Sequence, residues 1–364
     1  MKQGKKEQFA REHEALLAWY EVCGRKHLPW RNLDPSIASY GVYVSEIMLQ
    51  QTQVSSVLGY FERFMQAYPT LEALSGAKEE EVLVLWRGLG YYSRAKNLLK
   101  TARLTGGKLP DNLESLKKLA GIGDYTAGAI LCFGFGKAVG FFDTNIKRFL
   151  SRFFAISAPS PKILQNLADG FLNKKDAFNH NQALLDLGAL VCIAKNPRCN
   201  ICPLARFCKG VENPTLYTPH KAVAYEALEV DLGLYEEEGR IAMVRDREYS
   251  LLYGLPRLQS PADGESSKSC GESSLATRVK NPPQNPLPKP ARVLGSHLAT
   301  NGAKIPLLGS FKHSRTRYKI TARVYAIPAR PKDSEMIAIK DLPTTPLSSF
   351  ALKALKICGI EVER

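Results

Sequence analysis

Glu46 stands in a setting that could make it a proton donor near neutral pH. The stretch from Val42 to Val54, VYVSEIMLQQTQV, is otherwise neutral and largely apolar, so we expect this carboxyl group to be partly desolvated. Desolvation raises the pKa of a carboxylic acid and makes it a usable general acid. The alternative is a solvated glutamate in the first turn of a helix that Ser45 caps.

Asp143 is a second acid with a different expected role. It follows the apolar run from Ala138 to Phe142 and precedes Thr144 and Asn145, which predicts a carboxylate at a helix start. The free N–H groups of that helix would favour the ionised form, and a fixed negative charge could face a developing cation. A plain N-cap is the alternative, because aspartate is common there.

Four cysteines with the spacing C-x6-C-x2-C-x5-C predict a metal site: Cys192, Cys199, Cys202 and Cys208. Four thiolates can hold either zinc or an iron–sulfur cluster, and spacing alone gives only a modest preference for the cluster. Basic residues border the loop, which indicates contact with phosphate: Lys195, Arg198, Arg206 and Lys209. The other cysteines are isolated and need no special account.

Helices with a glycine hairpin between them should position these groups. The sequence Gly121-Ile122-Gly123 allows positive φ and a close backbone approach, and a helix start follows it. Helix, hairpin and helix together can grip a nucleic-acid backbone, although a Gly-x-Gly turn is often only a tight turn.

Two further stretches place aromatic residues beside arginine. Trp30 and Arg31 close the turn LPWR, and Tyr91 lies in the glycine-rich stretch GLGYYSR that interrupts a helical pattern. Such residues can cover a base or wedge a duplex, and they can equally be packing turns.

Composition favours a polyanionic partner. The chain has 364 residues, 45% of them hydrophobic, and a formal net charge of +15. We therefore expect two domains and a nucleic-acid partner. The N-terminal stretch has no apolar signal region and no run approaches a membrane span, so we expect a cytoplasmic protein without disulfides.

The pattern changes after Pro214, which predicts a helical domain over residues 1–213, a linker over 214–225 and a mixed α+β domain over 226–364. Alternation at Val230 to Leu234 and again at Ile241 to Met243 predicts a β-hairpin. The part at about 259–290 is rich in Ser, Pro, Gly and Asn and predicts a disordered insertion. A closing helix is expected from Ser349 to Cys358.

These motifs in this order resemble the adenine-specific DNA mismatch glycosylases of the MutY family, roughly from Glu7 to Val211. The resemblance rests on LPWR, SEIMLQQTQV, GLGYYSRAKNL, the hairpin with Asp143, and the cysteine loop. It implies a mainly α helix-hairpin-helix glycosylase domain, with a six-helix barrel and a [4Fe–4S]-bearing part, followed by a Nudix-like domain.

The resemblance also implies an activity, namely excision of adenine opposite 8-oxoguanine or guanine in double-stranded DNA by a bacterial, nucleoid-associated monomer. Glu46 would protonate the flipped base and Asp143 would stabilise the sugar cation, with Tyr125 and Asn145 beside them. The implied substrate and DNA contacts are Trp30, Arg31, Gln51, Thr52, Leu89, Tyr91, Gly121, Gly123 and Gln182, with His313 and Thr316 at the lesion.

Three other classes fit less well. An endonuclease III-like lyase for oxidised pyrimidines would carry a lysine where Tyr125 stands, and a non-catalytic iron–sulfur protein would lack one of the two acids. A nucleotide hydrolase would need the acidic Nudix box, which is missing from the second domain. Asp124 departs from the family pattern because it places negative charge near the expected phosphate.

Overall fold

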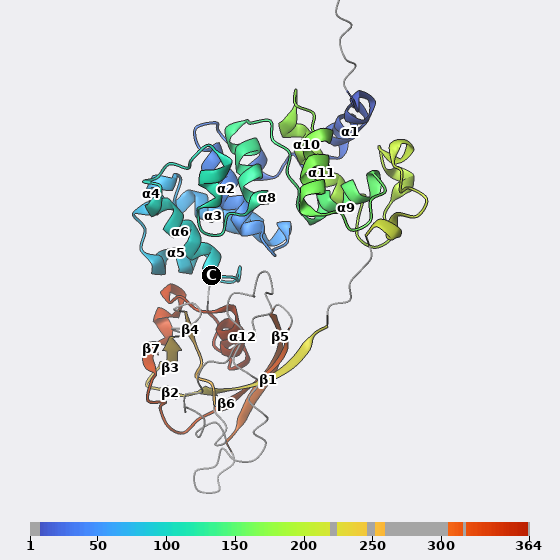
Figure 1. The fold of residues 1–364 in the computed structure, drawn as a ribbon. Coiled ribbons are helices and arrows are strands. Elements are labelled where there is room, and N and C mark those ends of the chain that lie inside the picture. The colour runs from blue at the N-terminus through green and yellow to red at the C-terminus, as the bar shows by residue number, and fades with distance from the viewer. Residues whose placement is uncertain (1–7, 219–223, 246–251, 259–304, 316–317, 363–364) are drawn as a thin grey trace, which may run out of the picture. The chain divides into compact units, whose positions relative to one another are not determined.

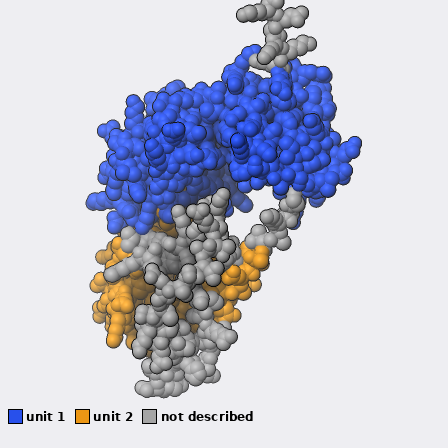
Figure 2. Space-filling view, in the orientation of Figure 1, with its two compact units in different colours: residues 1–85, 93–222 blue, residues 86–92, 223–364 orange. Residues whose placement is uncertain are grey.

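The computed structural model describes residues 8–218, 224–245, 252–258, 305–315 and 318–362. The chain divides into two compact units, one of residues 1–85 and 93–222 and the other of residues 86–92 and 223–364 (Figure 2). The expected insertion at 259–290 and the lesion-contact residue Thr316 lie outside the described residues. None of the described helices is long and apolar enough to cross a membrane.

The first unit is helical (Figure 1). Its α-helices are α1 (Ala10–Cys23), α2 (Ala38–Leu49), α3 (Val54–Ala67), α4 (Leu71–Ser75), α5 (Glu79–Leu85), α6 (Ser93–Leu104), α7 (Leu113–Lys117), α8 (Asp124–Ala129), α9 (Thr144–Phe153), α10 (Pro161–Phe171) and α11 (Ala177–Leu190). A π-helical turn, η2 (Ile130–Gly134), continues α8, and short 3₁₀ turns include η1 (Pro29–Arg31), η3 (Cys199–Ile201), η4 (Ala205–Phe207) and η5 (Pro214–Tyr217).

These helices form two groups. Helix α2 contacts α3, α6 and α8, whereas α1 and α9 both pack on α11 (Figure 1). Helix α2 is buried on nearly every face, because Tyr40 to Met48 are all buried. The Gly-x-Gly hairpin lies between α7 and α8, as the sequence predicts.

The second unit contains strands, with one helix near the end of the chain. Its elements are β1 (Glu226–Leu234), β2 (Glu236–Glu237), β3 (Arg240–Arg245), β4 (Tyr253–Gly254), β5 (Leu307–Arg315), β6 (Tyr318–Ala326), β7 (Glu335–Ala338), η8 (Ile339–Thr344) and α12 (Ser349–Ile357). One sheet has the order β1-β6-β5, and the other has β2-β3-β4 with β7 paired to β3. Apolar side chains from both sheets and α12 form one core that includes Leu232, Ile241, Val324 and Leu355.

The predicted β-hairpin is confirmed over a short length only, because β2 pairs antiparallel with β3 across the turn at Glu238 and Gly239, with Glu236 opposite Ile241. Strand β1 pairs in parallel with β6, so Val230 lies opposite Ala322, and only the short β2 pairs antiparallel with β3. Parallel pairing joins segments that are far apart in the sequence, which local alternation cannot indicate. The predicted closing helix is confirmed as α12.

Arg323, on β6, is largely neutralised by two acids. Its guanidinium donates to both carboxylate oxygens of Asp231, at 2.6 and 3.1 Å, and lies 3.4 Å from Glu229. Both acids come from β1, so this arginine holds the parallel strand pair together.

The segment of residues 86–92 belongs to the second unit. Arg87 donates to the carbonyl oxygens of Leu342 and Pro343, at 3.1 and 2.9 Å, and the Tyr92 hydroxyl donates to the carbonyl oxygen of Leu347 at 3.1 Å.

Candidate active site

Glu46 is a buried acid in the middle of α2. The residue is only 7% exposed, and the helix around it is largely apolar. Burial raises the pKa of Glu46 from 4.5 to about 7, and the negative charge of Asp143 adds to this, while a hydrogen bond from Tyr125 and the positive charge of Arg31 oppose it. Near pH 7 the carboxyl group is therefore about half protonated, as a general acid requires.

The alternative of a capped, solvated Glu46 is wrong. Helix α2 begins at Ala38 rather than at Ser45, and the Ser45 hydroxyl donates back to the carbonyl oxygen of Val42 at 2.9 Å. The predicted helix over 42–54 is also interrupted, because α2 ends at Leu49 and α3 begins at Val54.

Tyr125, from α8, is hydrogen-bonded to Glu46. Burial and the two nearby acids raise its pKa well above 10, so the phenol remains protonated and donates to the carboxylate. This contact joins α8 to α2 at the point where Glu46 lies.

Asp143 is the N-cap of α9 and is also partly buried. Its Oδ1 accepts from the backbone N–H groups of Asn145 and Ile146, at 2.9 and 2.7 Å, and its Oδ2 accepts from the Asn145 side chain at 2.9 Å. Burial raises the pKa of Asp143, while these three donors oppose the rise. Asp143 thus caps α9 and also lies close enough to Glu46 for its charge to raise the pKa of Glu46.

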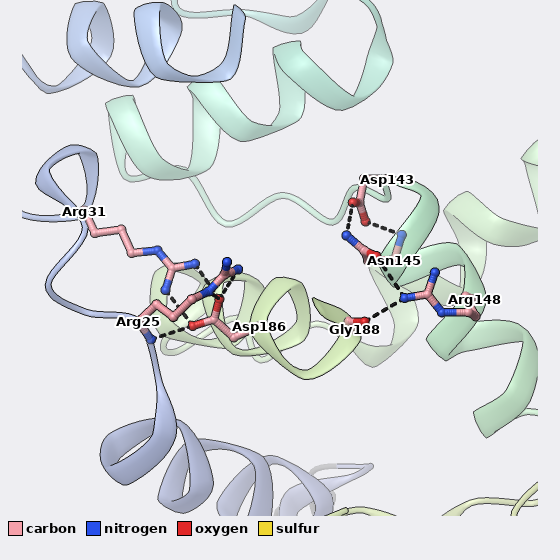
Figure 3. Close-up of polar contacts among 7 residues, drawn as sticks. All are labelled: Arg25, Arg31, Asp143, Asn145, Arg148, Asp186 and Gly188. Carbon is pink, nitrogen blue, oxygen red and sulfur yellow. Dashed lines mark hydrogen bonds and ion pairs between the residues drawn. The ribbon is translucent and has the colours of Figure 1, made fainter. Parts of the chain in front are cut away.

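Arg31 is held by a buried acid that sequence reasoning missed. Its two terminal nitrogens donate to the two carboxylate oxygens of Asp186, at 2.7 and 2.8 Å (Figure 3). Arg25 also donates to Asp186 from its backbone N–H and from Nε, at 2.8 and 2.7 Å. Burial tends to raise the pKa of Asp186, but the contacts with the two arginines outweigh it and lower the pKa.

Asp186 lies one helical turn after Gln182 on α11, and both are buried. An acid four residues from a candidate pocket residue is the one signal that could have singled it out, because residues at i and i+4 share a helix face. Trp30 is buried and packs against Phe61, with ring centroids 5.4 Å apart. It is therefore part of the hydrophobic core.

Arg148 connects Asp143 with the cysteine loop. Its Nη2 donates to Asn145 Oδ1 at 2.8 Å and to the carbonyl oxygen of Gly188 at 2.6 Å (Figure 3). Its Nε donates to the carbonyl oxygen of Cys192 at 2.7 Å. At Gly188 an added Cβ would lie 2.7 Å from Asn145 Cβ, so α11 and α9 approach as closely as the glycine permits.

Cys192, Cys199, Cys202 and Cys208 line one cavity, together with Arg152 and Arg198. About 390 Å³ between these residues is free of protein atoms, and this space includes open solvent. Among the described residues, no three His, Cys, Asp or Glu side chains are gathered closely enough for a single metal ion.

The hairpin places Gly121 in the left-handed region, with φ of +80°, whereas Gly123 is extended and is the N-cap of α8. The unexpected Asp124 forms an ion pair with Lys117 across the hairpin. Both side chains are largely exposed, so Asp124 competes with any anion for this lysine.

The remaining predicted contact residues lie in several places. Gln51 is exposed with φ of +57°, and Thr52 accepts a hydrogen bond from Arg94. Leu89, Tyr91 and His313 belong to the second unit, where Leu89 is buried and Tyr91 is 47% exposed with φ of +49°.

Comparisons with known proteins agree with the resemblance. Residues 44–174 match the model of the HhH-GPD superfamily of base excision DNA repair proteins. The chain is 41% identical over 213 residues to the adenine DNA glycosylase of Buchnera aphidicola subsp. Baizongia pistaciae, and 42% identical over 211 residues to that of Homo sapiens. The helical part of the chain is thus similar to adenine DNA glycosylases.

The alignments cover 56% of this chain and 60% of the Buchnera protein, and 54% of the chain and 38% of the human protein. The chain thus matches about three fifths or less of the length of these relatives. A solved structure described as a thermostable thymine-DNA glycosylase matches with a TM-score of 0.51 and 27% identity, covering 56% of this chain and 96% of that one. The helical part of the chain therefore has the HhH-GPD glycosylase fold.

Proposed function

We propose that this protein is a monofunctional DNA glycosylase that excises adenine mispaired with 8-oxoguanine or guanine. The observation that carries the proposal is the pairing of two unlike acids. Glu46 is buried with a pKa of about 7, and Asp143 is held by three N–H donors at a helix start. Acids whose environments differ in this way divide between proton donor and charge stabiliser.

The reaction breaks the bond between the deoxyribose C1′ and adenine N9. Adenine leaves poorly until it is protonated, so Glu46 donates a proton, at N7 by family analogy, after the base has left the stack. Asp143 stabilises the resulting oxocarbenium-like sugar, and water adds to C1′ with loss of a proton. The products are free adenine and an abasic site.

Neighbouring residues orient these groups. Tyr125 holds the Glu46 carboxyl group, Asn145 holds Asp143, and Arg31 and Gln182 line the adenine pocket. The hydrogen bond between Tyr125 and Glu46 supports this assignment. A lyase would need an amine at position 125, where the phenol stays protonated, which favours simple hydrolysis.

The DNA is held without sequence readout. Gly121 and Gly123 in the hairpin contact the DNA backbone, and Gln51 fills the space that the flipped adenine leaves. Thr52, Leu89 and Tyr91 are also proposed to contact the DNA. The positive φ of Gly121, the exposure of Gln51 and Tyr91, and the net charge of +15 support this part of the proposal.

The second unit is proposed to have a Nudix-like fold that recognises the lesion without Nudix chemistry. Its two small sheets, the parallel pair β1 and β6, and helix α12 support a mixed α+β fold. His313 on β5 and Thr316 are the candidates for contact with 8-oxoguanine. The sequence from Ser273 to Lys332 has twelve Lys and Arg and no Asp or Glu, which favours phosphate contact nearby.

The four cysteines are proposed to bind a [4Fe–4S] cluster through Cys192, Cys199, Cys202 and Cys208. When bound, such a cluster supplies structural cross-linking of the loop. Arg152 contributes from the protein side, because it is buried and donates to the carbonyl oxygens of Ile193 and Ala194 at 2.7 and 3.0 Å. Purified protein should contain about four iron and four sulfide per chain. Stoichiometric zinc in a colourless protein would contradict the assignment.

The decisive experiment measures base release under single-turnover conditions. One duplex carries adenine opposite 8-oxoguanine, a second carries adenine opposite guanine, and control duplexes carry uracil, thymine glycol or an abasic site. We expect free adenine from the first two duplexes only, with no strand cleavage. Release of an oxidised pyrimidine, or cleavage at the abasic site, would contradict a monofunctional adenine glycosylase.

A further inference from the structure

Arg94 makes an unusual set of contacts at the end of α2. It is the second residue of α6 and is only 6% exposed. Its Nη1 donates to the carbonyl oxygens of Ile47, Met48 and Gln50, at 2.9, 2.7 and 2.5 Å. Its Nη2 donates to the Thr52 hydroxyl at 3.1 Å. One guanidinium therefore spans the last turn of the helix that carries Glu46 and the turn that follows it.

The turn from Leu49 to Thr52 depends on such a contact. The last carbonyl groups of a helix have no partner within the helix, and a buried carbonyl without a partner is destabilising. A cation at a helix C-terminus also interacts favourably with the helix dipole. In addition, Gln51 has φ of +57°, a conformation that residues other than glycine rarely adopt unless their surroundings hold it.

The hairpin lies close both to this turn and to α6. The Gln50 side chain donates to the carbonyl oxygen of Gly121 at 3.2 Å, which links the turn with the hairpin. A Cβ at Gly121 would lie 3.0 Å from Asn97 Nδ2. Asn97 follows Arg94 by three residues, so the two side chains lie on one face of the helix.

We propose that Arg94 is a positioning residue that fixes Gln51 relative to the hairpin. The inference rests on the proposed function, in which the hairpin grips the backbone and Gln51 enters the duplex. Because Arg94 holds the Gln50 carbonyl oxygen before Gln51 and the Thr52 hydroxyl after it, and the Gln50 side chain is bonded to Gly121, binding of the hairpin presents Gln51 at a fixed distance. Arg94 acts through Gln51 and does not contact the reacting atoms.

The first test uses hydrogen exchange on the free protein and is independent of the proposed activity. The Thr52 N–H donates to the carbonyl oxygen of Leu49 at 3.2 Å, so its exchange reports on the turn. Arg94→Met should speed exchange at Thr52 by about tenfold or more, because several hydrogen bonds are lost. Arg94→Lys keeps a charged donor and should give a smaller increase. Unchanged exchange at Thr52 in either folded variant would overturn the proposal.

Arg103→Met is the matched control. Arg103 lies on the same helix and also donates to two carbonyl oxygens, those of Ser75 and Ala77, at 3.3 and 2.7 Å. Its loss should leave the exchange of Thr52 unchanged. An equal increase at Thr52 in this variant would show a general loosening of α6 and would overturn the specific role of Arg94.

The second test is a double-mutant cycle on single-turnover adenine excision. Arg94→Met and Gln51→Ala should each slow excision, and the combined variant should be about as slow as Gln51→Ala alone, because both remove the same action. Fluorescence of 2-aminopurine in place of the adenine should show the same pattern for base flipping. If the combined variant were slower by the product of the two single effects on the excision rate, the proposal would be overturned. If the wild-type protein released no adenine, the proposed function would fail while the exchange test still decided the role of Arg94.

Discussion

Arg31 and Asp186 form a bidentate ion pair, with N–O distances of 2.7 and 2.8 Å, although 155 residues separate them in the sequence. The Asp186 side chain is fully buried and that of Arg31 is 5% exposed. Pairing at both oxygens fixes the plane of the guanidinium, so Asp186 determines how Arg31 faces Glu46.

Asp186→Asn should destabilise the protein by about 3 kcal/mol or more, because it leaves buried guanidinium charge uncompensated. Thermal unfolding measures this loss, and excision should slow in parallel. The control is Glu21→Gln, which removes an exposed partner of Lys26 and should change stability by less than about 0.5 kcal/mol. Equal melting temperatures for Asp186→Asn and wild type would contradict a structural role for the pair.

Excision should slow as the pH rises through about 7. The pKa of Glu46 is raised to about 7 by burial, and the protonated form is the donor, so activity is present below that pKa and is lost above it. Single-turnover rates should fall about tenfold per pH unit above pH 8. Affinity for the duplex, measured over the same range, controls for altered binding. A rate that increases with pH would exclude Glu46 as the acid, as would near wild-type excision by Glu46→Gln.

Asp143→Asn should reduce excision by about 100-fold or more, because a fixed charge beside the developing cation is lost. Asp176→Asn is a matched control, since Asp176 is the N-cap of α11 and accepts from the N–H of Asn179 at 3.2 Å. Asparagine caps a helix about as well as aspartate, so both variants should change the unfolding free energy by less than about 1 kcal/mol. Only Asp143→Asn should affect the rate; equal rates for the two variants would reduce Asp143 to a cap.

Asp124→Asn should strengthen DNA binding, because it releases Lys117 from an ion pair for contact with phosphate. The plot of log affinity against log salt should become steeper by about one unit. Glu79→Gln removes the exposed partner of Lys96, 3.1 Å away, and provides a charge-matched control. If both variants bound DNA equally more tightly, the gain would come from net charge and not from the hairpin.

The sequence indicates the acids better than it indicates their partners. Glu46 in an apolar stretch and Asp143 at a helix start could be recognised locally, because composition and capping depend on neighbouring residues. Asp186 and Arg94 could not, because their roles arise from contacts with segments about 40 to 160 residues away. The pairing of β1 with β6 was missed for the same reason, since residues 92 apart, such as Glu226 and Tyr318, are register partners.

Gly188 should tolerate few substitutions, although it is not one of the reactive residues. It has no side chain and takes no part in the chemistry, yet an added methyl group would lie 2.7 Å from the Cβ of Asn145, which holds Asp143. In a library of variants, substitutions at this silent position should be depleted as strongly as substitutions at the acid itself. Tolerance along the chain therefore follows the packing distance to Asp143 and not the reactivity of the residue that is replaced.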